Sequence, residues 1–355
     1  MQTPPPAVAP AQAHPTAPVV AVQKLPSVIR WTVNITASPA APPVVEGDWI
    51  LVVLQSGVVA GHRLSDGTEA WHASLRSDQP VAADGGRIYV AAGDAIHALN
   101  AADGAPMWMA PSGPVTAPLL AHAGWLIAAT ASGLTAFRSA DGTKVWTRDT
   151  SAQHVRPTIE GDNLYVPLDD GHLLALDLAT GANRWVKHFK GAAGEVLAFS
   201  DRIYVGSADK WFYCFDAADG AREWRSRIGA ILRGRAAADD KRVFVTSMDN
   251  TLRAYDRRSG AQRWHPSVPY RPTTGPVLVG SSVVVPGNSA ELRAFEAATG
   301  KPAGQITLGE PLARPPAFGR SGDAVVLTAF TGTLNGQWKL VLVGPPVPAP
   351  SVPRE

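Results

Sequence analysis

The chain has 355 residues, 45% of them hydrophobic, and a formal net charge of only +2. Such a chain can bury a large core, but it lacks the excess of cations with which nucleic-acid-binding proteins neutralise phosphates. Its one cysteine, Cys214, excludes an intrachain disulfide and a cysteine-based zinc site. The sequence contains no run of 18 apolar residues, so it predicts no transmembrane helix.

The two ends of the chain differ in composition from the region between them. Residues 1–27 are rich in proline and alanine and lack a basic start followed by an apolar run, so they predict a disordered leader rather than a signal peptide. Residues 344–355 form a similar Pro-rich tail. We therefore expect the folded region to span residues 28–343.

A ten-residue phrase recurs along the folded region. It is clearest in LDLATGANRW (176–185), FDAADGAREW (215–224) and YDRRSGAQRW (255–264), and its seven copies follow one another at intervals of 37 to 40 residues. Apolar and polar residues alternate before the phrase, which is typical of a half-buried strand. The glycine of each copy permits the left-handed backbone of a tight hairpin turn. These glycines are Gly67, Gly104, Gly142, Gly181, Gly220, Gly260 and Gly300.

Six of the seven copies place a tryptophan four residues after the glycine, on the second strand of the hairpin. Because this tryptophan recurs once per repeat, we expect it to pack one repeat against the next rather than to bind a ligand. Trp31 fits the same series, since it lies 40 residues before Trp71. The predicted docking tryptophans are Trp31, Trp71, Trp108, Trp146, Trp185, Trp224 and Trp264.

Two further strands precede each copy, for example RPTIEG (156–161) and NLYVPL (163–168). Four antiparallel strands in about 40 residues are typical of one blade of a β-propeller. The innermost strands are expected near residues 43, 80, 118, 157, 195, 235, 276 and 315, which predicts an all-β, eight-bladed β-propeller. The last unit lacks an outer strand, and we expect VIRWTVN (28–34) to supply it and to close the ring.

The phrase resembles the tryptophan-docking repeat of quinoprotein propellers, the PQQ-dehydrogenase-like family, whose pattern is A-x-D-x-x-T-G-x-x-x-W. The best match is ALDLATGANRW (175–185), whereas AFEAATG (294–300) keeps the first half and has Gly304 in place of the tryptophan. The resemblance covers roughly residues 28–343 and implies the propeller fold.

Two functional groups share this repeat: PQQ-dependent dehydrogenases, and non-enzymatic proteins that resemble BamB, an eight-bladed lipoprotein of the outer-membrane β-barrel assembly machinery. The length and blade count of this chain are similar to the second group. The resemblance therefore implies a monomeric scaffold within a complex, in the periplasm or at the outer membrane, that binds the barrel-inserting subunit. A PQQ-dependent dehydrogenase and a ligand-sensing propeller remain as alternatives.

The enzyme alternative lacks candidate residues. For a PQQ-dependent dehydrogenase, the resemblance implies a calcium ion, an Asp base and often a vicinal disulfide. The single cysteine of this chain excludes the disulfide. The acidic pairs Asp169–Asp170 and Asp239–Asp240 are expected at outer hairpin turns, where Asp usually caps the backbone. We assign no catalytic, cofactor-binding or metal-binding residue and expect no cofactor. Cys214 takes the alanine position of its repeat, so we expect it to be a small buried residue.

Several segments that lead into the innermost strands are basic, and these segments should lie at the mouth of the central channel. One hypothesis is a basic rim that binds an acidic partner, with apolar anchors beside it. The alternative is a set of solvated arginines balanced by acids such as Glu195 and Glu310. The candidate partner-binding residues are Arg156, Arg233, Arg235, Arg271 and Arg314, with Leu232, Tyr270 and Leu312 beside them. Trp211 is a further candidate anchor on the surface.

Overall fold

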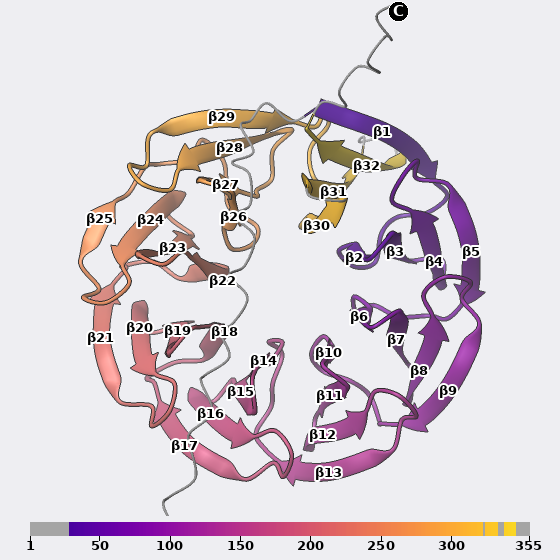
Figure 1. Cartoon of the computed structure of the whole chain (residues 1–355), viewed down its shortest axis with the longest axis horizontal. Coiled ribbons are helices and arrows are strands. Elements are labelled where there is room, and N and C mark those ends of the chain that lie inside the picture. Colours follow the sequence, from indigo (N-terminus) through magenta and orange to yellow (C-terminus); the bar gives the residue numbers. More distant parts are fainter. Residues whose placement is uncertain (1–27, 322–323, 333–336, 346–355) are drawn as a thin grey trace, which may run out of the picture.

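The computed structural model describes residues 28–321, 324–332 and 337–345. These residues form 32 strands in eight four-stranded antiparallel sheets. The sheets surround a central axis as blades (Figure 1), so the predicted all-β, eight-bladed β-propeller is confirmed. The predicted leader, residues 1–27, and residues 346–355 of the predicted tail lie outside the described residues.

In blades one to four, chain order follows the order from the channel to the outer edge. Blade one consists of β2 (Val44–Glu46), β3 (Trp49–Leu54), β4 (Val58–Arg63) and β5 (Glu69–Ser74). Blade two consists of β6 (Ala82–Asp84), β7 (Arg87–Ala92), β8 (Ala95–Asn100) and β9 (Pro106–Pro111). Blade three consists of β10 (Leu120–His122), β11 (Trp125–Thr130), β12 (Gly133–Arg138) and β13 (Lys144–Asp149). Blade four consists of β14 (Thr158–Glu160), β15 (Asn163–Pro167), β16 (His172–Asp177) and β17 (Asn183–His188).

Blades five to seven keep this order, and blade eight departs from it at its outer strand. Blade five consists of β18 (Ala193–Phe199), β19 (Arg202–Ser207), β20 (Trp211–Asp216) and β21 (Arg222–Arg227). Blade six consists of β22 (Leu232–Ala238), β23 (Arg242–Ser247), β24 (Thr251–Asp256) and β25 (Gln262–Trp264). Blade seven consists of β26 (Val277–Val279), β27 (Ser282–Val285), β28 (Glu291–Glu296) and β29 (Pro302–Thr307). Blade eight consists of β30 (Ala317–Ser321), β31 (Ala324–Gly332), β32 (Trp338–Gly344) and β1 (Val28–Ile35).

The strand β1 closes the ring, as the sequence predicts. It pairs antiparallel with β32, with Thr32 opposite Val341, although the two strands are more than 300 residues apart. The inner edge of β32 is covered by β31 and its outer edge by β1, so blade eight is completed by both ends of the chain. Closure gives blade eight the fourth strand that the other blades have and pairs the outer edge of β32.

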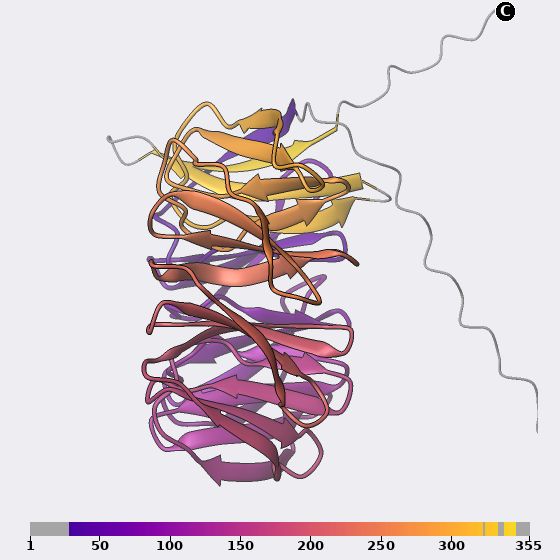
Figure 2. The same ribbon diagram turned by 90° about the vertical axis from the view of Figure 1, so that its left-hand side faces the viewer.

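The hydrophobic core is divided among the junctions between blades. Eight buried clusters each join residues of two neighbouring blades; Ile127 of blade three, for example, packs in one cluster with Leu176 of blade four. The two middle strands of each blade supply most of these residues because both of their faces are covered. Figure 2 shows the blades packed face to face.

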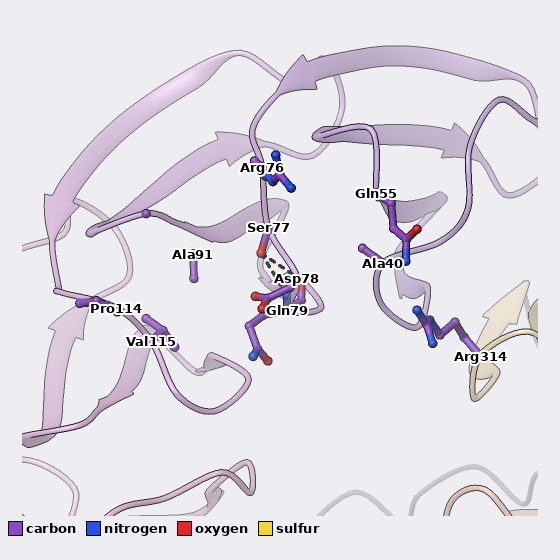
Figure 3. Close-up of a pocket in the computed structure, with 11 residues that line it drawn as sticks. Ala40, Gln55, Arg76, Ser77, Asp78, Gln79, Ala91, Pro114, Val115 and Arg314 are labelled. Carbon is purple, nitrogen blue, oxygen red and sulfur yellow. Dashed lines mark hydrogen bonds between the residues drawn. The ribbon is translucent and has the colours of Figure 1, made fainter.

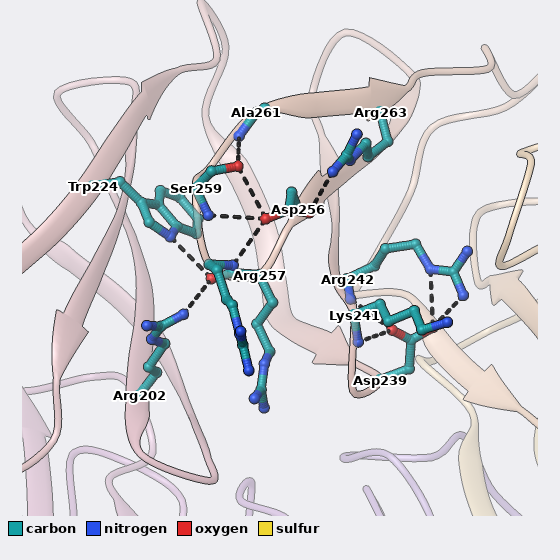
Figure 4. Close-up of polar contacts among 11 residues, drawn as sticks. Arg202, Trp224, Asp239, Lys241, Arg242, Asp256, Arg257, Ser259, Ala261 and Arg263 are labelled. Carbon is teal, nitrogen blue, oxygen red and sulfur yellow. Dashed lines mark hydrogen bonds and ion pairs between the residues drawn. The ribbon is translucent and has the colours of Figure 1, made fainter.

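The repeat tryptophans lie at these junctions. At the junction of blades five and six, the Trp224 indole N–H donates to the Arg257 carbonyl at 3.0 Å (Figure 4), and a Cβ on Gly260 would lie only 2.5 Å from the Trp224 ring. Trp264 packs on Gly300 in the same way, but its buried N–H has no hydrogen-bond partner within the described residues. Between blades seven and eight, Gly304 occupies the equivalent position. Seven of the eight junctions therefore contain a docking tryptophan.

Within the described residues, no helix is long and apolar enough to cross a membrane.

Candidate functional site

Three charged residues occupy one repeated position at the channel wall. In each of the three blades that carry them, one residue of the innermost strand pairs with the aromatic residue at the centre of the second strand. The charged residue lies two positions before that paired residue, and it is Arg156, Glu195 or Arg235. They therefore represent the same register position in blades four, five and six. The other blades carry neutral residues there: Pro42, Pro80, Pro118, Gly275 and Pro315.

β-Bulges position two of these side chains. The innermost strands β18 and β22 are seven residues long, and each contains a register shift, between Ala193 and Val196 in β18 and between Arg233 and Ala237 in β22. A bulge adds a residue to one strand and re-aims its side chains. Each bulge therefore places one charged residue, Glu195 or Arg235, at the channel.

The backbone of the next blade presses closely on the β22 bulge. Gly234 within the bulge has a φ of +63°, which favours glycine. A Cβ on Gly275 would lie 1.8 Å from the Arg235 carbonyl oxygen, so only glycine fits there. The Thr246 hydroxyl is within hydrogen-bond distance of the carbonyls of both Arg233 and Thr274, which ties the bulge to blade seven's leading segment. These contacts hold Arg235 on a rigid support.

The three charges face a cavity of about 390 Å³ that also contains His122 and Glu160. Their side chains are open to solvent, but the surrounding blades remove much of their water. This desolvation, together with repulsion from Arg235, lowers the pKa of Arg156. Desolvation also lowers the pKa of Arg235, and it raises the pKa of Glu195 against the opposing effect of the two arginines. Within the described residues none of the three forms an ion pair, although the two arginines share the cavity with the carboxylates of Glu195 and Glu160.

Arg233 extends this charged surface towards an apolar residue. It lines an adjoining cavity of about 250 Å³ with Leu232 and Ile231, and its Nε lies 2.7 Å from the Met248 sulfur. Leu232 is half-buried against Gly206. Ile231 is 48% exposed and was not among the predicted site residues. In the sequence, Ile231 is indicated as a candidate surface contact by its position next to two basic residues in ILRGR.

Arg314 lies in a different part of the ring. Figure 3 shows it near Gln55 and the loop that contains Arg76 and Asp78, and these residues line a cavity of about 780 Å³. Its Nε donates to the Pro39 carbonyl at 3.1 Å. None of the other four predicted arginines lines this cavity, so the structure divides the predicted rim. Arg271 is exposed on the segment that leads into blade seven, and it lines neither the cavity of Arg156 and Arg235 nor that of Arg233.

Tyr270 and Leu312 are buried, contrary to their expected role as surface anchors. Tyr270 is 9% exposed, its hydroxyl donates to the Val285 carbonyl at 2.7 Å and accepts from the Arg293 amide at 2.6 Å, and its ring covers Gly287. Burial raises the pKa of Tyr270 to about 12. Both residues belong to inter-blade core clusters, where they stabilise the fold.

The two acidic pairs lie at turns other than the expected outer hairpins. Asp239–Asp240 connects the two innermost strands of blade six, and Asp169–Asp170 connects the second and third strands of blade four. The Asp239 carboxylate accepts from the backbone amides of Lys241 and Arg242, which is the local capping role that was predicted. Among the described residues, no three His, Cys, Asp or Glu side chains form a group that could hold a metal ion.

Comparison with known proteins identifies the type of propeller. The family model described as outer membrane protein assembly factor BamB matches residues 55–197 and 190–315. No curated protein matches the sequence significantly.

Solved structures of several propellers are similar. BamB from Moraxella catarrhalis is 19% identical with a TM-score of 0.72, and the alignment covers 91% of this chain and 100% of that protein. Quinohemoprotein alcohol dehydrogenase from Comamonas testosteroni is 14% identical with a TM-score of 0.71, covering 92% of this chain and 78% of the enzyme. The computationally designed protein Ika8 is 12% identical with a TM-score of 0.71, covering 88% of this chain and 98% of the design.

At these identities, structural likeness shows the fold alone, because scaffolds, enzymes and a designed protein share it. The family match rests on the sequence and spans seven of the eight blades in whole or in part. The chain therefore belongs to the PQQ-type repeat family described as outer membrane protein assembly factor BamB.

Proposed function

We propose that this protein is a non-enzymatic scaffold of the cell envelope that binds a protein of the outer-membrane β-barrel assembly machinery. In this proposal the protein acts in the periplasm or at the inner surface of the outer membrane. The channel mouth of blades four to six, with Arg156, Arg233 and Arg235, provides the binding surface.

The observation that carries the proposal is the placement of three unpaired charges at one register position of adjacent blades. Arg156 and Arg235 have lowered pKa values because they are partly desolvated, an effect that exceeds the attraction of the nearby carboxylates. An acidic side chain from a partner would relieve this cost and form charge-assisted hydrogen bonds to the guanidinium groups. Exposed Ile231 beside them supplies an apolar contact of the kind found at the centre of protein interfaces.

The experiment is a pull-down of the tagged protein from detergent-solubilised cell envelope, with bound proteins identified by mass spectrometry. We expect the wild type to recover the barrel-inserting subunit and the Arg156→Glu/Arg235→Glu variant to recover at least tenfold less of it, since truncating or reversing a partly buried charge pair costs roughly 2–5 kcal/mol. Arg258→Glu/Lys301→Glu, which changes two exposed hairpin residues of blades six and seven, is the control with the same change in charge.

The variant Arg314→Glu tests whether the second cavity belongs to the same interface. Loss of binding with Arg314→Glu would extend the surface across the ring, and unchanged binding would confine it to blades four to six. Recovery of no assembly subunit by the wild type would refute the proposal.

The likeness to quinohemoprotein alcohol dehydrogenase favours a second candidate, a quinone-dependent dehydrogenase. Titration of the protein with PQQ and calcium, followed by quenching of tryptophan fluorescence, tests it directly. Saturable binding with alcohol-dependent dye reduction would favour the enzyme.

A further inference from the structure

A basic groove runs between blades four and five at the outer edge of the ring. Its walls come from the neighbouring outer strands β17 and β21 (Figure 1), from the segment that follows β17 and from β20. The cavity has a volume of about 640 Å³. Its cationic residues are Lys187, Lys190, Arg222, Arg225 and Arg227, and Trp211, Tyr213 and Phe215 supply aromatic surface.

The repeat itself shows that this composition is particular to blade five. Arg225 and Arg227 stand one and three residues after the docking tryptophan, and Arg222 stands two residues before it. No other docking tryptophan has an arginine at any of these three positions. The residues one and three positions after it in the other blades are His72 and Ser74, Met109 and Pro111, Thr147 and Asp149, Val186 and His188, His265 and Ser267, and Thr32 and Asn34. Packing between blades therefore does not require the arginines.

Strand alternation directs cations from both blades into the groove. Trp224 and Ser226 contact Gly260 of blade six, so Arg225 and Arg227, which alternate with them, project from the opposite face of β21 towards blade four. From blade four, the Lys187 side chain reaches towards the hairpin of blade five, where its Cε would lie 2.6 Å from a Cβ on Gly220. The positive charges thus converge from two facing surfaces.

These cations have no anionic partner among the described residues. In the part of the chain that the structure describes, none of the five forms an ion pair, although the whole chain carries a net charge of only +2. The one carboxylate lining the groove, Asp209, already accepts from the Tyr213 hydroxyl at 2.7 Å and from the Trp211 amide at 3.1 Å. Arg225 lies over the Trp211 ring at 4.4 Å from its centroid, a contact that orients the guanidinium plane.

We propose that this groove binds a ligand through phosphate groups. Guanidinium groups match phosphate oxygens in paired hydrogen bonds, and three arginines can together satisfy the several acceptors that one or two phosphates present. The volume suits a small phosphorylated molecule or a phosphorylated lipid headgroup, within the usual range of ligand cavities of about 300–1,000 Å³. A single side-chain carboxylate of an acidic protein offers fewer oxygens than the groove has donors. The site is separate from the channel mouth and does not depend on the proposed function.

Isothermal titration calorimetry with inorganic pyrophosphate at low salt tests the site. We expect saturable binding that weakens with added salt and falls at least tenfold in Arg225→Gln/Arg227→Gln. Arg258→Gln/Lys301→Gln, with the same loss of charge on exposed hairpins of blades six and seven, should bind as the wild type does. The single variant Arg227→Gln, whose side chain is exposed, is available if the double variant does not fold.

Flotation with vesicles that contain phosphatidic acid, compared with phosphatidylcholine alone, identifies the source of the phosphate. Binding to the phosphatidic acid vesicles that is lost in the same variants supports a lipid headgroup, and binding to pyrophosphate alone supports a free ligand. The proposal is overturned if neither probe binds, if both variant pairs weaken binding equally, or if a hexaglutamate peptide binds as tightly as pyrophosphate. The last result would instead indicate an acidic protein partner.

Discussion

Asp249 follows β23 in the turn that leads to β24, and Arg253 and Ser247 donate hydrogen bonds to its carboxylate. Burial alone would raise the pKa of Asp249, but these hydrogen bonds outweigh it and lower the pKa to about 2. A folded-state pKa below the ordinary value of 3.8 means that the carboxylate stabilises the fold above about pH 4 and that this contribution is lost as the pH falls towards 2. The side chain is 36% exposed, so solvent screening limits the contribution to about 1 kcal/mol.

We therefore expect Asp249→Asn to lower the free energy of unfolding at pH 7 by about 1 kcal/mol and to flatten its decline between pH 4 and pH 2. Urea unfolding at a series of pH values measures both effects. Asp240→Asn, an exposed carboxylate in the turn after β22, is the control. Parallel curves for wild type and Asp249→Asn below pH 4 would contradict the assignment.

At the scale of the element, the hairpin glycine and the docking tryptophan act as one unit. Gly260 has a φ of +70°, and a Cβ there would lie 2.5 Å from the Trp224 ring. Gly113 has a φ of +75°, but a Cβ there would meet no atom within 4 Å. Both alanine substitutions strain the backbone by roughly 1 kcal/mol, while Gly260→Ala also forces the indole aside at a further cost of about 1–3 kcal/mol.

The comparison of Gly260→Ala with Gly113→Ala thus isolates the packing of the indole. Chemical denaturation should show the larger loss of stability for Gly260→Ala, together with a change in tryptophan fluorescence. Equal losses for the two variants would mean that the docking contact contributes little.

The repeat made these elements predictable because each copy contains its own turn, its own strand alternation and its own tryptophan. The repeat did not predict, however, which residues lie close together around the ring. Arg156 and Arg314 belong to blades four and eight, which lie across an eight-bladed ring from each other, so the likeness of their segments did not bring them together. Tyr270 was expected at the surface because it adjoins an arginine, but Gly287 leaves a space that its ring fills.

Other features required the strand faces to be followed residue by residue. The sequence singled out Trp211 as a candidate surface residue. The basic groove, however, depends on Arg225 and Arg227, which both project from the face of β21 that lines the groove. The bulges of β18 and β22 depend on contacts with the next blade and leave only a weak local signal, the extra length of the two strands. Both features became visible only once the blades were placed side by side.

At the scale of the whole molecule, stability depends on closure by β1. Deletion of residues 1–35 should leave the outer edge of β32 unpaired and remove Trp31 from its contact with Gly67. Because several kcal/mol of pairing and burial would be lost and each kcal/mol shifts the Tm of a large domain by roughly 2 °C, we expect Tm to fall by about 10 °C or more. The exposed edge should also promote association.

Thermal unfolding and size-exclusion chromatography with light scattering measure these effects. Deletion of residues 1–27 alone, which retains β1, serves as the control. A shortened chain that lacks β1 but stays monomeric with an unchanged Tm would show that the ring does not need this strand.

Because Gly304 stands where the other junctions have an indole, we expect the ring to open most readily at the junction of blades seven and eight. Seven junctions are fastened by an aromatic ring on a neighbouring hairpin, whereas the junction of blades seven and eight relies on smaller apolar side chains such as Ile306 and Leu327. Blade eight is also the blade that is assembled from both ends of the chain. Thermal fluctuations that part neighbouring blades should therefore concentrate at this junction, so that amide hydrogens of β29 and β1 exchange with solvent sooner than those of the other outer strands. In a ring of similar blades, the absence of one indole side chain at position 304 would thus determine which junction opens first.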